Sequence, residues 1–344
     1  MDSLTQLVLG ASVGEAVLGR KVGNRAIVWG AIGGTIPDLD VLLNPLLSDV
    51  QGVLIHRTFS HSLLVLTLLA PIIGYGVWRI HRSKTEASWR DWSWLFFFAL
   101  ITHPLLDAFT NYGTMLFFPF SDVRISWRTI FIIDPLYTLP LLIGTLIVLF
   151  LSRTSSRRKQ VNRWALILSS AYLALTVIIK LHVQQVVQEN LTEQSSVAHQ
   201  KFLTSPTFFN NVLWSVIVKQ EGQYQVGYYS LLDNDHTVKF KNIPQRAELL
   251  QPYVQSSETK ETLDNLINFT EGFYALQPHK EGVRFNDLRF GIITGWFDLT
   301  KAYIFSYQIS KEDDTVLIQQ QDRAVQPTLS DLQRLFQRTL GTTP

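Results

Sequence analysis

Histidine and aspartate recur at short intervals in the first 140 residues of this 344-residue chain, within stretches that are otherwise apolar. Imidazole nitrogen and carboxylate oxygen are the ligands that Zn²⁺ prefers, and Mn²⁺ is a second candidate. A charge inside an apolar membrane segment costs at least about 2.5–3.5 kcal/mol, so such residues indicate a function. Structural hydrogen bonding among helix ends is the alternative. The set comprises Asp38, Asp40, His56, His61, His103, Asp107 and Asp134.

The spacing within this set indicates which kind of element holds each side chain. His103 and Asp107 are four residues apart, which places them on one face of a helix. His56 and His61 are five residues apart, so at least one of them belongs to a loop. Asp134 precedes a proline at a predicted helix start, where capping of the helix and metal binding are equally good interpretations. Ser60 and Thr110 are interpreted as supporting hydrogen-bond donors or caps.

Apolar segments that could span a membrane carry or flank these residues. Four of the segments are about 20 residues long, as a bilayer requires. Two weaker segments near the start are rich in glycine, which lets membrane helices pack closely as a hairpin. We therefore predict an α-helical polytopic membrane domain of about six spans over residues 1–181. The segments are 4–19, 26–43, 62–80, 92–110, 130–151 and 163–181, and the glycines are Gly10, Gly14, Gly30, Gly33 and Gly34.

The positions of the basic residues predict how these segments are oriented. Most of the Lys and Arg residues before residue 182 fall in three short loops, at 20–25, 79–90 and 153–163. Loops of this kind stay in the cytoplasm. The segments that carry histidine and aspartate then end on the outer face, and residues 182–344 are extracytoplasmic.

Residues 182–344 are typical of a soluble α+β domain joined to the membrane domain by a helical stalk at 182–200. Alternating apolar residues at 212–219 and 223–232, separated by a Glu-Gly pair, predict a hairpin. Further strands are predicted at 283–292 and 302–310, and helices at 258–270 and 328–340.

Composition excludes several classes of function. The chain has no cysteine, which excludes disulfide frameworks, thiolate metal sites and cysteine nucleophiles. A net charge of +2 argues against a nucleic-acid partner. Only 17% of the residues are charged, against about 25% in soluble domains, so membrane lipid is the expected partner. For Arg57, Arg124 and Arg128 on the predicted outer side, contact with lipid headgroups and binding of an anionic substrate are equally good interpretations.

Four stretches carry a resemblance to a known family. MDSLTQLVLGASVGEAVLGRKVGNRA, GTIPDLD, HRTFSHSLL and HPLLDAFTNYG resemble the LexA-regulated, membrane-bound metal-dependent hydrolases of the bacterial inner membrane, over about residues 1–150. The resemblance implies a multi-pass inner-membrane protein with a divalent-metal site and hydrolase activity. Many members have a histidine where this chain has Gln6, a poor zinc ligand, so a metal at that corner is expected to be weaker or absent. The implied ligands are Asp38, Asp40, His56, His61, His103 and Asp107.

A shorter similarity favours phosphoester chemistry, because the His103-x-x-x-Asp107 element is similar to ligand pairs of zinc-dependent phospholipases C and single-strand nucleases. We therefore predict a membrane-embedded hydrolase acting at the outer face on a phosphoester or lipid-linked substrate, with zinc or manganese. Asp107 is expected to be a ligand at the catalytic centre, and Asp134 a ligand or base. The alternatives are a scaffold with a structural metal and, less favoured, a metal or proton transporter, because only Glu15 lies away from the outer face.

Overall fold

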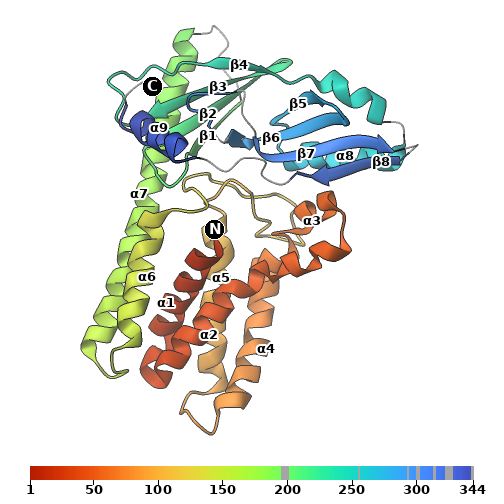
Figure 1. The fold of residues 1–344 in the computed structure, drawn as a ribbon. Helices are drawn as coiled ribbons and strands as arrows, with labels where there is room; N and C mark the ends of the chain where they lie inside the picture. Colours follow the sequence, from red (N-terminus) through yellow and green to blue (C-terminus); the bar gives the residue numbers. More distant parts are fainter. Residues whose placement is uncertain are drawn as a thin grey trace. The chain divides into compact units, whose positions relative to one another are not determined.

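The chain folds into two compact units, of which one is helical and the other combines helices with sheets (Figure 1). The computed structural model describes residues 1–194, 201–254, 256–292, 294–299, 303–312, 315–321 and 328–341. Unit 1 comprises Met1–Leu42, Ile55–Ile178 and Phe208–Asn210, and unit 2 comprises Leu43–Leu54, Ile179–Thr207 and Asn211–Pro344.

Helices make up the first half of the chain, and polar caps fix where several of them start. Ser62 caps α4, Ser88 and Asp91 form a capping box at the start of α5, and Asp134 caps α6. Each cap accepts hydrogen bonds from backbone N–H groups that a helix start leaves without partners. The helices are α1 (Ser3–Val22), α2 (Asn24–Thr35), α3 (Asp49–Ile55), α4 (Leu63–His81), α5 (Trp89–Asp107), α6 (Pro135–Leu149) and α7 (Ser156–Gln194), with the 3₁₀ helices η1 (Ile36–Leu46) and η2 (Phe59–His61).

Fewer helices qualify as membrane spans than the sequence predicted. Within the described residues, three stretches are long and apolar enough to cross a membrane: Asn24–Leu46, Leu63–His81 and Ser156–Glu193. Helix α6 is apolar but has 15 residues, or about 22 Å, against a hydrocarbon core of about 30 Å. Helices α1 and α5 form as predicted but carry too many polar side chains to qualify. Length and composition therefore support up to three spans, and not six.

The predicted glycine-rich hairpin is present as α1 and α2, whose backbones touch. A Cβ atom on Gly10 would lie 2.3 Å from the carbonyl oxygen of Gly30, and one on Gly14 would lie 2.3 Å from that of Ala26. No side chain fits between the helices at these points. In the same way, a Cβ atom on Gly34 would lie 2.5 Å from the carbonyl oxygen of Gln6.

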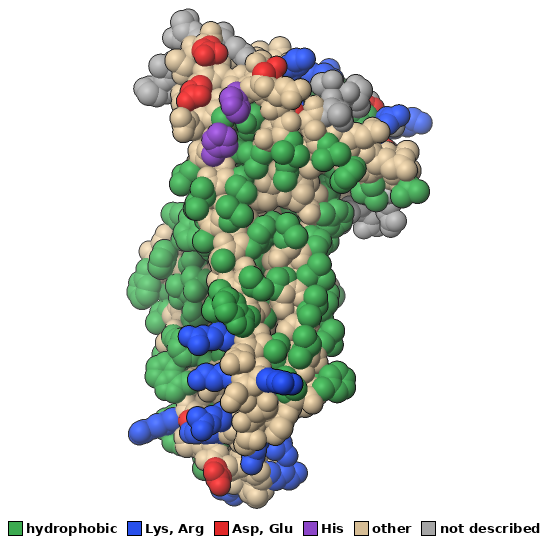
Figure 2. All heavy atoms as spheres, turned by 90° about the vertical axis from the view of Figure 1, so that its left-hand side faces the viewer, with side chains coloured by type: hydrophobic (Ala, Val, Ile, Leu, Met, Phe, Trp, Pro, Cys, Tyr) green, Lys and Arg blue, Asp and Glu red, His purple; other side chains and the backbone are tan. Residues whose placement is uncertain are grey.

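The two ends of unit 1 differ in charge. The basic turns that join α1 to α2, α4 to α5 and α6 to α7 lie together at one end, opposite the start of α1 and the end of α5 (Figure 1). Figure 2 shows hydrophobic side chains over the helical surface and Lys and Arg side chains gathered at its lower end.

A buried ion pair joins three helices near the basic end. Arg158 of α7 donates from Nε and Nη2 to the two carboxylate oxygens of Glu15 on α1, over 2.7 and 2.6 Å. Its Nη1 donates to the carbonyl oxygens of Val148 and Leu151 at the end of α6. Glu15 and Arg158 are both buried, and the pair links the first helix of unit 1 to the last.

Unit 2 contains two four-stranded antiparallel sheets, with strand orders β1-β2-β3-β4 and β5-β6-β7-β8. Gly222, with φ of +69°, occupies the predicted hairpin turn between β2 and β3. Residues 195–200 and 302 of the predicted elements lie outside the described residues. The strands are β1 (Phe202–Pro206), β2 (Leu213–Gln220), β3 (Gln223–Ser230), β4 (Lys241–Pro244), β5 (Tyr274–His279), β6 (Gly282–Ile292), β7 (Tyr303–Glu312) and β8 (Thr315–Gln320), and the helices α8 (Ser257–Phe269) and α9 (Leu329–Thr339) follow β4 and β8.

The segment predicted as a stalk is part of the core of unit 2. It continues α7 without a break to Gln194. Val183 and Val187 are fully buried and pack in one cluster with Trp214 and Val216 of β2. The end of α7 therefore holds the first sheet by apolar packing.

Candidate metal centre

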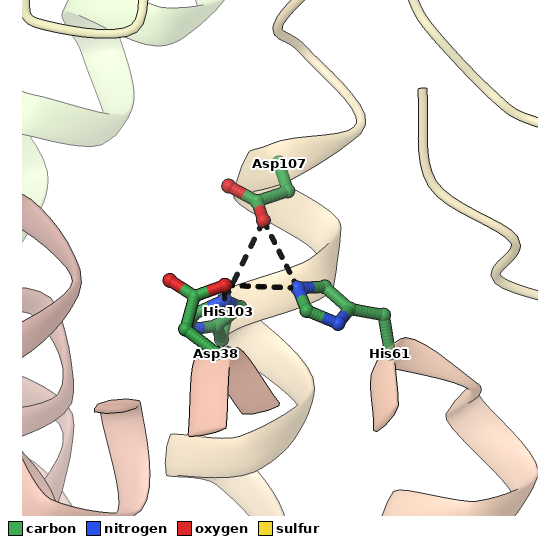
Figure 3. Close-up of side chains that lie close together, drawn as sticks. All are labelled: Asp38, His61, His103 and Asp107. Atoms are coloured by element: carbon green, nitrogen blue, oxygen red, sulfur yellow. Dashed lines mark ion pairs between the residues drawn. The ribbon is translucent and has the colours of Figure 1, made fainter. Parts of the chain in front are cut away.

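Four of the predicted residues converge in unit 1 (Figure 3). One ligand atom from each of Asp38, His61, His103 and Asp107 lies within 4.8 Å of the other three. We call these four residues the tetrad. His61, His103 and Asp107 are fully buried, whereas the side chain of Asp38 is 26% exposed. Any access from solvent or lipid to the tetrad is therefore on the side of Asp38.

The spacing within the tetrad suits a small divalent cation. His61 Nε2 lies 3.4 Å from Asp38 Oδ1 and 3.3 Å from Asp107 Oδ2, and His103 Nε2 lies 3.4 Å from each of the same two oxygens. Tetrahedral zinc sites with ligand distances of about 2.0–2.1 Å have ligand–ligand separations of about 3.3–3.4 Å. All four atoms are buried and have no hydrogen-bond partner among the described residues. Uncompensated burial of four polar atoms is costly, and a cation would remove that cost.

Hydrogen bonds at the far side of each imidazole turn its Nε2 lone pair toward the centre. His103 Nδ1 lies 2.6 Å from the carbonyl oxygen of Gly34, which only accepts, so Nδ1 carries the proton. Ser60 donates to Asp40 over 2.6 Å and therefore accepts from His61 Nδ1 over 2.9 Å. This arrangement is typical of metal-binding histidines.

The second oxygen of Asp107 is held by neighbouring donors. Gln6 Nε2 donates to Asp107 Oδ1 over 2.9 Å, and the backbone nitrogen of Met1 binds the same oxygen. Arg57 Nε lies 3.2 Å from Asp107 Oδ2, the oxygen that faces the tetrad. Gln6 therefore supports the tetrad through Asp107, and its own side chain is not one of the converging ligands.

Asp40 and His56, also predicted as ligands, form a separate pair beside the tetrad. His56 Nδ1 donates to Asp40 Oδ1 over 2.8 Å, and Asp40 Oδ2 accepts from the backbone of Arg57 and from Ser60. Ligand atoms of this pair and of Asp38 lie within 4.8 Å of one another. The hydrogen bonds of Asp40 thus orient two histidines: His56 directly, and His61 of the tetrad through Ser60. The side chain of His56 is 20% exposed.

Three local features bring the tetrad together. The close packing of α1 on α2 places the carbonyl of Gly34 against α5, and η1, which follows α2 directly, carries Asp38 in its first turn. The loop before α4 turns sharply at Arg57, whose φ is +62°, and delivers His61 from η2. Helix α5 presents His103 and Asp107 on one face, as the four-residue spacing predicted.

Asp134 lies outside both groups of candidate ligands. Its Oδ1 accepts from the backbone nitrogens of Leu136 and Tyr137 at the start of α6, over 2.9 and 3.4 Å. Its Oδ2 accepts from the Tyr172 hydroxyl over 2.8 Å. Of the two interpretations of Asp134, the structure shows the helix cap.

The three predicted substrate-binding arginines lie in different surroundings. Arg57 is 5% exposed and is the arginine that contacts the tetrad, through Asp107. Arg124 donates to the carbonyl oxygen of His56 over 3.1 Å. Arg128 is also buried and donates to the carbonyl oxygen of Ser126. Gly34 was predicted to allow close helix packing, but its contact with His103 was not, because a carbonyl that orients a histidine leaves no side-chain signal.

Comparison with known proteins identifies the helical part of the chain. A family model described as YdjM inner membrane protein matches residues 1–183. The match covers the tetrad, the Asp40–His56 pair and all of unit 1 up to the middle of α7. No curated protein and no solved structure matches.

Proposed function

Because the chain belongs to the YdjM inner membrane protein family, we propose that it is a membrane-embedded hydrolase that depends on a divalent metal held by the tetrad. The observation that carries this proposal is the convergence of four buried ligand atoms that have no hydrogen-bond partner within the described residues. Two imidazoles and two carboxylates favour zinc, and manganese is the alternative.

The chemistry that a divalent cation supplies at this position is Lewis-acid activation of an ester and of the attacking water. The Asp40–His56 pair lies alongside and is arranged as a general base. Asp40 holds the Nδ1 proton of His56, which leaves Nε2 to accept a proton from water. This assignment makes His56 a catalytic residue, Asp40 its positioning residue, and Asp107 a metal ligand.

The surroundings of Asp38 favour a lipid or lipid-linked phosphoester as substrate. Asp38 is the most exposed member of the tetrad, and large apolar side chains are exposed near it in sequence: Leu39 is 53% and Leu42 is 70% exposed. Phe59, two residues before His61, is also exposed. A polar centre bordered by exposed apolar side chains suits an amphiphile whose head reaches the metal. Arg57, which lies 3.2 Å from Asp107 Oδ2, is a cation available to its anionic group.

Orientation in the membrane is part of the proposal. The tetrad lies at the end of unit 1 opposite the basic turns, and basic turns are retained in the cytoplasm. We therefore place the tetrad at the outer face, with a multi-pass membrane domain over residues 1–181 and an extracytoplasmic domain over residues 182–344.

A structural metal site in a non-catalytic scaffold is the second candidate. Four protein ligands fill a tetrahedral shell, as in structural zinc sites, whereas catalytic sites keep a position open. The exposure of Asp38 and the adjacent Asp40–His56 pair favour catalysis over this reading.

Two substitutions in the full-length protein separate the candidates. His103→Ala removes a tetrad ligand, so metal content falls under either function. His56→Asn leaves the tetrad intact, and a catalytic role predicts unchanged metal content and melting temperature with turnover reduced about 10²–10⁴-fold. His279→Asn, on an exposed residue at the end of β5, is the control.

The measurements are metal content, melting temperature and hydrolysis of phosphoesters and short-chain phospholipids on the same preparations. A stoichiometric metal whose loss in His103→Ala collapses stability, with no hydrolysis by the parent protein, would establish the scaffold. Absence of bound metal from the parent protein would contradict both candidates.

A further inference from the structure

A cavity of about 870 Å³ lies within unit 2, and none of the tetrad residues lines it. Its walls come from β3, the segment 233–241, the turn 295–299 and α9. Small-molecule sites usually occupy about 300–1,000 Å³ and combine apolar walls with a few placed polar groups. The volume of this cavity, and its walls drawn from four segments of the chain, therefore suit a small-molecule ligand.

The cavity carries an excess of unpaired positive charge. Lys239, Lys241 and Arg334 line it, and their side chains form no hydrogen bond or ion pair with the described part of the chain. Arg338 is neutralised by Asp233, to which it donates from two nitrogens over 2.6 and 2.9 Å. Asp235 also lines the cavity, so its four cations and two carboxylates leave a net charge of +2. The remaining cations are placed to receive an anionic group.

Aromatic side chains form the other wall. Trp296 is buried and Phe297 half-buried, and both line the cavity. The Arg334 guanidinium lies 4.7 Å from the centroid of the Phe297 ring, which fixes one cation at the boundary between the polar and the aromatic wall. The cavity therefore offers separate surfaces to an anionic group and to an apolar one.

Helix α9 continues the apolar surface outward. Arg338 and the buried Leu335 face the domain, while Leu332 and Phe336 are exposed, the latter by 65%. These two residues, with Gln333 and Gln337, line an open hollow of about 570 Å³. Gln337 also lines the larger cavity, so the cationic cavity and the apolar hollow adjoin.

We propose that this adjoining pair is a binding site for an anionic phospholipid, with its phosphate near Lys239, Lys241 and Arg334 and an acyl chain along Leu332 and Phe336. Charge complementarity selects the anionic headgroup, and the exposed stripe of α9 selects a hydrocarbon tail. The family to which the chain belongs places it at a membrane, where such lipids abound. The site is independent of the tetrad and of the proposed hydrolysis.

The test uses the full-length protein in phosphatidylcholine nanodiscs, titrated with the water-soluble lipid dihexanoyl-phosphatidylglycerol. The readout is protection from hydrogen exchange over residues 237–241 and 329–341. Dihexanoyl-phosphatidylcholine supplies the same tails without net charge, and glycerol 3-phosphate supplies the anionic headgroup without tails. Protection by phosphatidylglycerol, at concentrations at least about tenfold below those needed for either of the other two, is expected.

Matched variants assign the effect to the named residues. Lys239→Gln/Lys241→Gln is expected to weaken phosphatidylglycerol binding about tenfold, since each basic residue near an anionic surface contributes several-fold. Phe336→Ser is expected to weaken it several-fold while leaving glycerol 3-phosphate unaffected. The controls are Lys260→Gln/Lys280→Gln and Val254→Ser, on exposed residues that line neither cavity.

Three results would overturn the proposal. Equal protection by the phosphatidylcholine would exclude recognition of charge. Equal protection by glycerol 3-phosphate, with no effect of Phe336→Ser, would identify a site for soluble organic phosphates. Binding that survives the double lysine substitution would place the ligand elsewhere.

Discussion

At the scale of single residues, the tetrad depends on side chains that never enter it. Ser60 connects His61 to Asp40, and Asp40 in turn orients His56. One carboxylate thus determines the ring orientation in two histidines. Supporting hydrogen bonds of this kind typically change metal affinity by about 10–100-fold.

Ser60→Ala tests this connection. The substitution removes the group that accepts the Nδ1 proton of His61, so the imidazole is no longer held with Nε2 toward the tetrad. Metal affinity should fall about 10–100-fold with little change in the melting temperature of the metal-free protein. Competition with a chelator of known affinity measures this, and Ser152→Ala, in the α6–α7 turn, is the control. Unchanged affinity would show that packing alone orients His61.

The sequence predicted which residues lie close together better than it predicted how they divide into groups. Residue types singled out seven His and Asp side chains, and the family resemblance implied six of them as ligands; these six lie in two adjoining groups that share Asp38. Their division could not be predicted, because it depends on the loop that brings the backbone of Arg57 and the hydroxyl of Ser60 to Asp40. Such contacts follow from tertiary structure and have no signature in spacing.

At the scale of elements, the packing of α1 on α2 determines the positions of Gly34 and Asp38 at the tetrad. Gly10 and Gly30 meet without side chains between them, and the carbonyl oxygen of Gly34, one turn beyond Gly30, accepts a hydrogen bond from His103 Nδ1. Any separation of these helices moves the carbonyl of Gly34 and, just after it, Asp38. Packing and metal binding are therefore coupled through the backbone.

Gly30→Ala should reveal that coupling. Its Cβ would lie 2.3 Å from the carbonyl oxygen of Gly10, so the helices must separate. A loss of about 1–3 kcal/mol in stability is expected from overpacking, together with weaker metal binding. Gly76→Ala on α4 is the matched control, since no atom lies within 4 Å of its built Cβ and alanine favours helix. Melting temperature and metal content that stay at parental values in Gly30→Ala would refute the coupling.

Helix positions were largely predictable, whereas the number of spans was not. Apolar runs located α4, α5 and α6, but α1 and α5 bury polar residues such as Gln6 and His103 against other helices. A polar residue lowers the mean hydropathy of a segment, but it adds little to the free energy of membrane insertion when it faces a neighbouring helix. Composition alone cannot separate that case from a helix outside the membrane.

At the scale of the whole molecule, the proposed orientation can be measured directly because the chain has no cysteine. Single cysteines at the exposed positions Lys84, Asp122, Thr154 and Glu221 give four probes without background labelling. An impermeant thiol reagent applied to intact spheroplasts should label Asp122→Cys and Glu221→Cys. Lys84→Cys and Thr154→Cys should react after permeabilisation only. Labelling of Lys84→Cys in intact cells, or protection of Glu221→Cys, would reverse or break the proposed orientation.

The ion pair between Glu15 and Arg158 can form only late in translation of the helical unit. The two residues are 143 positions apart, and ribosomes add about 5–20 residues per second. Glu15 therefore leaves the ribosome on the order of 10 s before its partner exists. During that interval Glu15 lacks the arginine that pairs with it in the folded unit, so the contact between α1 and α7 forms only after α7 has been translated. The last helix of unit 1 thus closes the bundle, and the nascent chain has no finished helical unit until most of α7 has been translated.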